Sequence, residues 1–431
     1  MTNPEMKTID HPGLSYQELP NGAQVYFQKM PGLRSVCIGV AVRAGSSHEP
    51  ADLGGIAHFT EHMVFKGTTK RDAFSLKEPI EKVGGTLNAF TGKETTVYFA
   101  RVPDFQAKVA LEILLDIGQN AVFPEEEFSL EKEVVIEEIW SSEDDPVDQV
   151  YENLFQLAWN GGAYGRPVLG NFESVSRTER KDLVDFYRSQ YHSKNLIVSV
   201  AGDVAQDFFN PLEAFPTGNA DLSPAVLEYA PKEQVVFEEK EDLQQVHLLL
   251  GLRAPGRKDP HFDAFQVLNV ILSGGMSSRL FHRVREKLGL VYAIDSGLIS
   301  YPSNGIFYIY AATSAEKVGR LVEELRGQVS DLLQHGVREE ELEYGKARFR
   351  GKLLLSTEST YSSMMRNLDS GLSLGRPETV EKMVERILHI DSEKLQEVIR
   401  EYLSHPWLMS TVVPTRSVDL LKASKILEKG F

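Results

Sequence analysis

The most informative stretch of this chain of 431 residues is Gly54-Gly55-Ile56-Ala57-His58-Phe59-Thr60-Glu61-His62-Met63-Val64-Phe65-Lys66-Gly67. His58 and His62 are four residues apart, so on a helix both imidazoles point from one face, with Glu61 beside them. Neutral imidazole nitrogens suit Zn²⁺, and a nearby carboxylate can take a proton from water that the ion has activated. The stretch therefore predicts a zinc-binding helix, with Asp52 as its N-cap and Gly67 as its C-cap.

Two alternatives compete with a metal site: a motif this short can arise by chance, and a histidine pair can simply decorate a helix. The neighbours of the motif favour the metal site, because apolar residues surround His58 and His62 instead of lying opposite them. Imidazoles on a buried face need polar partners. Two imidazoles that face one point therefore indicate a set of metal ligands.

Composition restricts the class of protein. A chain of this length is long for one domain and comfortable for two, and 42% apolar with 25% charged residues is typical of a folded globular protein. The net charge of −16 opposes binding to nucleic acid or to an anionic membrane. We therefore expect neither as a partner.

The single cysteine, Cys37, excludes an intrachain disulfide, and its strand-like surroundings favour a core position over a nucleophile. The first residues lack a basic and then apolar signal, and no apolar run approaches the length of a membrane span. We expect a cytoplasmic protein.

The two halves of the sequence resemble each other at an offset of about 210 residues. Gly165-Arg166-Pro167 recurs as Gly375-Arg376-Pro377, and a proline-rich stretch separates the halves. We therefore predict a tandem duplication, with a catalytic zinc-binding domain at 1–215, a linker at 216–232 and a homologous domain without metal at 233–431.

Strand-like alternation and helices of more than about ten residues follow one another within each half. The predicted strand pairs are 23–27 with 35–42, and 85–90 with 95–101. The predicted fold class is α+β, with two homologous tandem domains that each consist of a mostly antiparallel sheet covered by helices.

The duplication supplies an internal control. Alignment of the halves places Phe265, Leu268 and Asn269 where the first half has His58, Glu61 and His62. The same helix therefore forms without these side chains, which favours a functional role for them.

A catalytic zinc usually takes three protein ligands, so a third donor is needed. The segment 125–145 predicts a helix on which Glu131 and Glu138, seven residues apart, lie on the side of Val134 and Val135. A carboxylate buried there needs a cation or strong donors. The glutamates at 133 and 137 fall elsewhere on the helix, and the second half has Arg348 near the corresponding position.

These motifs resemble the pitrilysin, insulin-degrading enzyme and mitochondrial processing peptidase family of inverted zinc peptidases, in particular its short two-domain bacterial branch. That family combines H-x-x-E-H with a downstream E-x6-E segment. The resemblance implies one Zn²⁺ per chain, with His58, His62 and Glu138 as ligands and Glu131 as a supporting carboxylate. It implies that Glu61 is the general base and not a ligand.

Two further motifs match the family and imply a peptide-binding role. The strand Gly84-Gly85-Thr86-Leu87-Asn88-Ala89-Phe90-Thr91 implies that Asn88, Ala89 and Phe90 bind an extended peptide. An R-x6-Y motif, preceded by Ser277-Ser278-Arg279-Leu280, implies that Arg285 and Tyr292 bind the peptide carbonyl and the developing oxyanion.

The expected function is that of a zinc metalloendopeptidase acting on unfolded peptides or oligopeptides. Longer relatives carry four such domains in one chain, whereas this chain has two. We therefore expect a homodimer that forms a chamber, in which Arg285 and Tyr292 of one subunit serve the zinc of the other.

Two rival functions remain. Some relatives are non-catalytic, or are one partner subunit of a processing-peptidase-like heterodimer. A serine hydrolase is suggested by Gly371-Leu372-Ser373-Leu374-Gly375, but a nucleophile elbow needs a strand before the serine, and a helix-like segment precedes it here.

Overall fold

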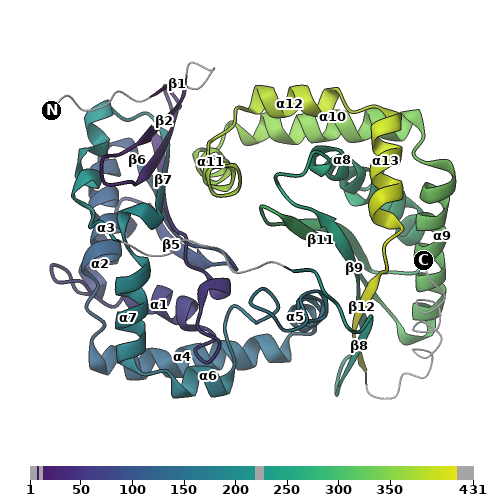
Figure 1. Ribbon diagram of the computed structural model, residues 1–431, viewed down its shortest axis with the longest axis horizontal. Coiled ribbons are helices and arrows are strands. Elements are labelled where there is room, and N and C mark those ends of the chain that lie inside the picture. Colours follow the sequence, from purple (N-terminus) through teal and green to yellow (C-terminus); the bar gives the residue numbers. More distant parts are fainter. Residues whose placement is uncertain (1–6, 9–12, 219–227, 415–431) are drawn as a thin grey trace. The chain divides into compact units, whose positions relative to one another are not determined.

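The computed structural model describes residues 7–8, 13–218 and 228–414, which form two compact α+β units (Figure 1). The first unit comprises Met1–Ser141, Arg166–Val226 and Leu355–Thr379. The second comprises Ser142–Gly165, Leu227–Leu354 and Val380–Phe431. Each unit has one sheet with helices packed on it, so the predicted fold class is confirmed.

The first unit has a seven-stranded sheet in the order β1-β2-β3-β7-β4-β6-β5. The strands are β1 (Lys7–Thr8), β2 (Leu14–Glu18), β3 (Gln24–Lys29), β7 (Leu196–Gly202), β4 (Ser35–Val42), β6 (Thr96–Pro103) and β5 (Thr86–Thr91). Neighbours are antiparallel except for the parallel pair β3 and β7. The sheet is therefore mostly antiparallel, as predicted.

One of the two predicted strand pairs is correct. β5 pairs with β6, which confirms the pairing of 85–90 with 95–101. The pairing of 23–27 with 35–42 is wrong, because β7 lies between β3 and β4. Every residue of β7 is buried, and a strand covered on both faces gains most from an interior position where both backbone edges are bonded.

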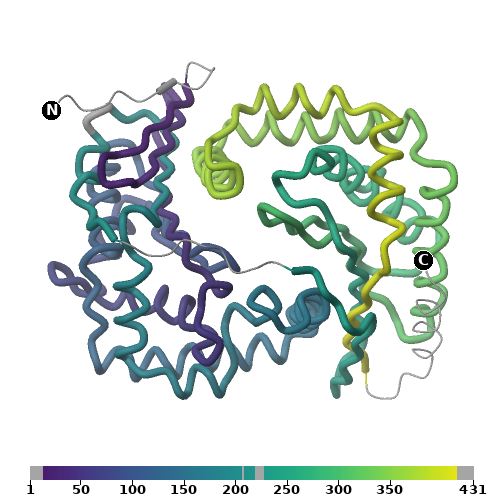
Figure 2. The backbone as a smooth tube through the Cα atoms, in the orientation of Figure 1, coloured from purple at the N-terminus to yellow at the C-terminus, as the bar shows by residue number. Residues whose placement is uncertain are grey.

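The second unit has a five-stranded sheet in the order β10-β11-β9-β12-β8. Its strands are β10 (Ala293–Ser300), β11 (Asn304–Thr313), β9 (Val246–Pro255), β12 (Leu408–Pro414) and β8 (Val235–Lys240). The C-terminal β12, yellow in Figure 2, runs antiparallel to β9 and parallel to β8. This order repeats β5-β6-β4-β7-β3 of the first sheet, including its one parallel pair, so the tandem duplication is confirmed.

Each unit takes one helix from the other half of the sequence. Helix α11 (Thr360–Leu374) belongs to the first unit and packs on β7 and β4, where the Ser199 hydroxyl donates to the Met364 carbonyl oxygen at 3.0 Å. Helix α5 (Pro146–Ala158) belongs to the second unit and packs on β12 and β9, with Leu154 against Gly251. The compact units therefore do not coincide with the halves of the sequence repeat, because each half contributes one helix to the other unit.

The predicted domain boundaries remain a prediction about the sequence, and residues 219–227 of the predicted linker lie outside the described residues. The other helices of the first unit are α1 (Ile56–Val64), α2 (Ala73–Glu81), α3 (Ala107–Asn120), α4 (Glu125–Asp144), α6 (Phe172–Arg177) and α7 (Arg180–Gln190). Those of the second unit are α8 (Phe262–Ser273), the π-helix η5 (Phe281–Lys287), α9 (Val318–His335), α10 (Glu339–Ser356), α12 (Val380–Leu388) and α13 (Ser392–Leu403).

Two sequence features have structural explanations. Cys37 is fully buried in β4, where burial raises the pKa of its thiol to about 12, as expected for a core residue. Ser373 is buried near the end of α11, so the Gly371–Gly375 stretch is the end of a helix and not a strand-to-helix elbow. Among the described residues, no helix combines the length and the apolar character needed to cross a bilayer.

Candidate metal centre

Helix α1 carries the H-x-x-E-H motif and is held at its N-terminus by Glu49. The buried Glu49 carboxylate accepts hydrogen bonds from the N–H groups of Gly55 and Ala57, each at 2.9 Å. Gly55 is the N-cap, in the left-handed region at φ 89°, and Phe65 is the C-cap. The predicted caps Asp52 and Gly67 are therefore wrong, because a carboxylate from outside the segment satisfies the free N–H groups of the first turn.

His58, His62 and Glu138 converge between α1 and α4. The Nε2 atoms of His58 and His62 lie 3.6 and 3.5 Å from Oε2 of Glu138. One donor atom of each residue lies within 4.8 Å of the other two, and within the described ranges this is the one such group of His, Cys, Asp and Glu side chains. The structure thus assembles two nitrogen donors and one oxygen donor, a set that suits zinc and leaves a fourth position open.

The two imidazoles are held differently. Burial, helped by the neighbouring His62, lowers the pKa of His58 to about 3, so this ring is neutral and its lone pair is available. Nδ1 of His62 lies 2.9 Å from Oε1 of Glu131. A proton on that Nδ1 leaves the lone pair on Nε2, the atom that faces Glu138.

Glu131 is kept ionised in a buried position. Burial would raise its pKa, but hydrogen bonds from His62 and Lys66 outweigh that effect and lower it. The Lys66 ammonium forms a close ion pair with Oε2, the carboxylate oxygen that does not face His62. Lys66 was not predicted as a site residue, although it follows His62 by four residues and lies just after the end of α1.

The burial of the two α4 carboxylates differs from the prediction. The Glu131 side chain is only 10% exposed, as predicted, whereas the Glu138 side chain is 44% exposed. The buried side of α4 runs through Phe128, Glu131, Val135 and Ile139. Glu138 lies at the margin of this side, so its carboxylate reaches the two imidazoles from the edge of the core.

Glu61 has a separate environment. Its Oε2 accepts a hydrogen bond from the Thr91 hydroxyl of β5 at 2.5 Å. Burial raises the pKa of Glu61, and the charge of Glu138 adds to this, while Thr91 and His62 oppose it. A carboxyl whose pKa is raised toward neutrality suits a general base. Thr91 is the last residue of the predicted strand motif, but its hydrogen bond to Glu61 was not predicted.

The strand that contains Asn88, Ala89 and Phe90 is β5, at the edge of the first sheet. The Ala89 N–H donates to the side-chain oxygen of Asn88 at 2.8 Å, while Phe90 is exposed. Beside this edge is a hollow of about 210 Å³. Its lining residues are Glu61, His62, Phe65, Lys66, Lys77, Leu87, Asn88, Ala89 and Glu131.

Arg285 and Tyr292 lie together in the second unit. The Arg285 guanidinium lies 5.9 Å from the centre of the Tyr292 ring and 4.7 Å from that of Phe281. Tyr292 is 74% exposed, so its hydroxyl is accessible to a ligand. The structure thus brings these two predicted residues together, in the unit that does not contain His58 and His62.

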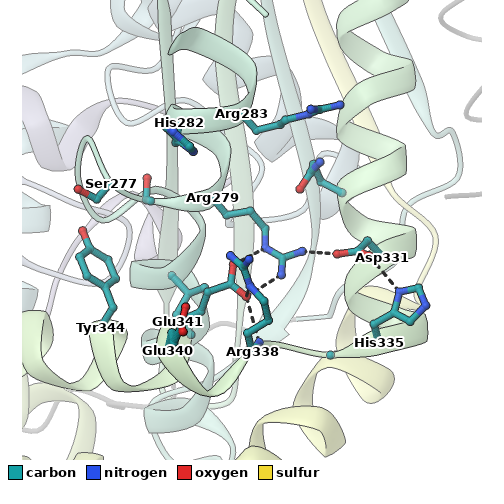
Figure 3. Close-up of a pocket in the computed structure, with 14 residues that line it drawn as sticks. Ser277, Arg279, His282, Arg283, Asp331, His335, Arg338, Glu340, Glu341 and Tyr344 are labelled. Carbon is teal, nitrogen blue, oxygen red and sulfur yellow. Dashed lines mark hydrogen bonds and ion pairs between the residues drawn. The ribbon is translucent and has the colours of Figure 1, made fainter. Parts of the chain in front are cut away.

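The π-helix η5 that carries Arg285 is held by the preceding motif. Figure 3 shows Arg279 between α9 and α10, where it binds Glu341 at 2.8 Å and Asp331 at 2.7 Å. A hollow of about 590 Å³ opens here, and its cations Arg279, Arg283 and Arg338 are all in ion pairs. π-helices are rare, and these ion pairs tie η5 and the residues before it to α9 and α10.

The second unit has no counterpart of the metal centre at the aligned positions. Phe265 and Leu268 of α8 are fully buried in its core, and Asn269 accepts a hydrogen bond from the Ser296 hydroxyl at 2.5 Å. Arg348 of α10 donates to the Gly274 carbonyl oxygen. These side chains have packing and hydrogen-bonding roles, in agreement with the internal control.

Two family models match the chain. Residues 24–171 match the model described as insulinase (peptidase family M16), and residues 177–349 match the model described as the peptidase M16 inactive domain. The latter description agrees with the absence of the ligand set from the aligned helix α8.

Among curated proteins, the chain is 34% identical to the uncharacterized zinc protease YmxG of Bacillus subtilis, over 92% of this chain and 97% of that protein. It is 37% identical to an uncharacterized zinc protease of Rickettsia felis, over 79% of this chain and 83% of that one.

Solved structures share the fold. A protease from Helicobacter pylori superposes with a TM-score of 0.85 at 23% identity, covering 94% of this chain and 100% of that chain. A structure from Pseudomonas fluorescens, titled as a peptidase M16 inactive domain, also gives 0.85, at 21% identity over 94% and 99% of the two chains.

Proposed function

The chain belongs to the insulinase family of M16 peptidases, and on this basis we propose that it is a zinc-dependent endopeptidase that hydrolyses unfolded peptides or oligopeptides. Relatives named as zinc proteases support a protease that uses zinc. The observation that carries the proposal is the convergence of His58, His62 and Glu138 with the buried Glu61 beside them.

The donor set fits one Zn²⁺ per chain. His58 is neutral, and His62 is oriented by Glu131. The partly exposed Glu138 supplies the third donor atom from the margin of the core. When bound, zinc supplies a Lewis acid that polarises a peptide carbonyl and lowers the pKa of a water molecule. We assign these three side chains as the ligands and Glu131 as the carboxylate that holds His62 in place.

Glu61 is the proposed general base. Its carboxylate is oriented by the Thr91 hydroxyl and has a raised pKa, so it can take a proton from the attacking water and give it to the leaving amine. Thr91 lies on the same strand as Asn88 to Phe90. One element therefore carries both the partner of the base and the proposed peptide-binding edge.

The exposed edge of β5 supports binding of an extended peptide by strand addition, in which main-chain hydrogen bonds give affinity with little sequence preference. Asn88, Ala89 and Phe90 are the proposed contacts. Arg285 and Tyr292 are the proposed donors to the peptide carbonyl and to the developing oxyanion. Their proximity to each other and the exposure of Tyr292 support a shared role.

We further propose that two chains form a homodimer in which Arg285 and Tyr292 of one chain act on a peptide at the metal centre of the other. Mixed dimers of Glu61→Gln and Tyr292→Phe chains, each inactive alone, should recover part of the wild-type activity. Verified mixed dimers without recovered activity would show that each chain contains a complete site.

The test of the main proposal is cleavage of quenched peptides by the purified protein, with chelator and added zinc. We expect stoichiometric zinc, loss of cleavage with chelator and recovery with zinc. The alternative function is that of a non-catalytic or partner subunit of a processing-peptidase-like heterodimer. Zinc binding without cleavage of any peptide, or no zinc at all, would favour this alternative.

A further inference from the structure

The hollow beside the metal centre has two chemically different walls. Phe65, Leu87 and Ala89 give it an apolar side, and two lysines, Lys66 and Lys77, supply ammonium groups. Its volume of about 210 Å³ is enough for one side chain of a peptide but not for a large cofactor. Its lining includes Glu61 and His62, so a group bound there would lie next to the scissile bond in the proposed reaction.

Lys66 is already neutralised. Its ammonium forms the close ion pair with Glu131 and lies 4.0 Å from Glu127. Glu131 is in turn bonded to His62, so these three side chains form one connected chain of contacts. A new anion in the hollow would have to compete with Glu131 for Lys66.

Lys77 is a different case. It lies on the exposed side of α2, and in the described part of the chain it forms no ion pair. The adjacent acid, Glu78, is paired with Lys82 at 3.2 Å. Lys77 therefore contributes a positive charge to the hollow that is not ion-paired with any side chain in the described ranges.

We propose that this hollow is a subsite for a carboxylate of the peptide substrate, and that Lys77 is the residue that recognises it. The inference rests on the proposed peptidase function and adds a substrate preference to it. The carboxylate belongs either to a Glu or Asp side chain or to the C-terminus of a short peptide. The apolar wall accommodates the methylene groups next to the charge, which suits Glu better than Asp.

The two acids of the hollow have other partners. Glu131 is ion-paired with Lys66, and Oε2 of Glu61 accepts a hydrogen bond from the Thr91 hydroxyl, so neither carboxylate is paired with Lys77. The chain as a whole carries a net charge of −16, so it gives no general attraction for anions. A preference for a carboxylate would therefore be local to Lys77.

The test begins with a neutral peptide whose cleaved bond is located by mass spectrometry. Glu and Gln are then compared at each of the positions that flank this bond. At one position we expect kcat/KM to be about two- to fivefold higher for Glu, the range for one partly exposed ion pair. The preference should disappear in Lys77→Met, reverse in Lys77→Glu, and fall in high salt.

Lys82→Met is the matched control, because it removes a lysine of the same helix region that does not line the hollow. It should retain the wild-type ratio of Glu to Gln. A second series amidates the C-terminus of short peptides that end close to the cleaved bond. A rate loss on amidation that Lys77→Met abolishes would identify the terminal carboxylate as the ligand.

The inference is overturned if wild-type protein cleaves these peptides with no effect of Glu or of amidation at any position, or if Lys77→Met leaves the ratio unchanged. Failure to cleave any peptide would instead count against the proposed function. In that case the affinity of Glu and Gln peptides for the Glu61→Gln chain, measured by fluorescence anisotropy, still tests Lys77. Equal affinities would overturn the inference.

Discussion

Nδ1 of His62 lies 2.9 Å from Oε1 of Glu131, and the other oxygen of this carboxylate is paired with Lys66. His62, a proposed ligand on α1, is thus oriented by a buried acid on α4, and this acid is kept ionised by a lysine that lies just after the end of α1. Such outer contacts fix the orientation of an imidazole and tune its affinity for a metal. The proposed metal centre should therefore depend on Lys66 as well as on the three proposed donors.

Replacing Lys66 should weaken metal binding. In Lys66→Met, the buried Glu131 loses its cation and holds His62 less firmly. We expect the dissociation constant for zinc, from competition with a chromogenic chelator, to rise about tenfold or more. Lys77→Met is the control, since it removes a lysine of the same hollow without touching Glu131, and it should bind zinc as the wild type does. Wild-type affinity in Lys66→Met would refute this role.

Glu61→Gln should separate metal binding from catalysis. The substituted amide can still accept the Thr91 hydrogen bond but cannot take a proton, so we expect kcat to fall by about 10²- to 10⁴-fold while one zinc per chain remains. Metal content is measured by atomic absorption, and kcat with a quenched peptide. Glu137→Gln, on the exposed side of α4, controls for removal of a charge. Loss of zinc in Glu61→Gln would instead make Glu61 a ligand.

Glu341 should make the stability of the second unit depend on pH. Burial would raise its pKa, but hydrogen bonds from Arg279 and Arg338 lower it from 4.5 to about 2. Because the folded value is the lower one, the contribution is present above pH 4.5 and disappears as pH falls toward 2. It amounts to at most about 3 kcal/mol.

The Glu341→Gln chain should therefore be less stable than the wild type near pH 7, and the gap should narrow below about pH 4. Urea unfolding followed by circular dichroism at several pH values measures this gap. Glu340→Gln is the matched control, because Glu340 is the exposed neighbour of Glu341 and forms no ion pair among the described residues. A gap that stays constant with pH would contradict the assignment.

Gly371→Ala should destabilise the first unit through the exchanged helix α11. An added Cβ would lie 2.0 Å from the ring of Tyr26, which is fully buried and has little room to move. We expect a loss of about 1–3 kcal/mol in the free energy of unfolding. Gly351→Ala, also inside a helix but with nothing near its Cβ, should be neutral or stabilising. Equal effects of the two substitutions would argue against this packing.

Local pattern predicted the elements that carry the site. The helix around His58, the helix 125–145 and the strand pair at 85–101 all form, because their periodicity and turn residues are properties of neighbouring residues. The errors are tertiary. Asp52 does not cap α1, because Gly55 is the N-cap and Glu49 accepts the N–H groups of the first turn. Strands 23–27 and 35–42 are separated by a strand far away in sequence.

The sequence by itself determined the duplication, the fold class and the candidate donors, since repeats and helical spacing are visible in the order of residues. Only the tertiary structure decided that Glu138 reaches His58 and His62 from the margin of the core. It also decided that Thr91 binds the Glu61 carboxylate and Lys66 that of Glu131. Lys77, in contrast, has no ion-pair partner among the described residues. These relations depend on distances between side chains that are far apart in sequence. Such distances are set by how the helices pack on the sheet, which no local pattern contains.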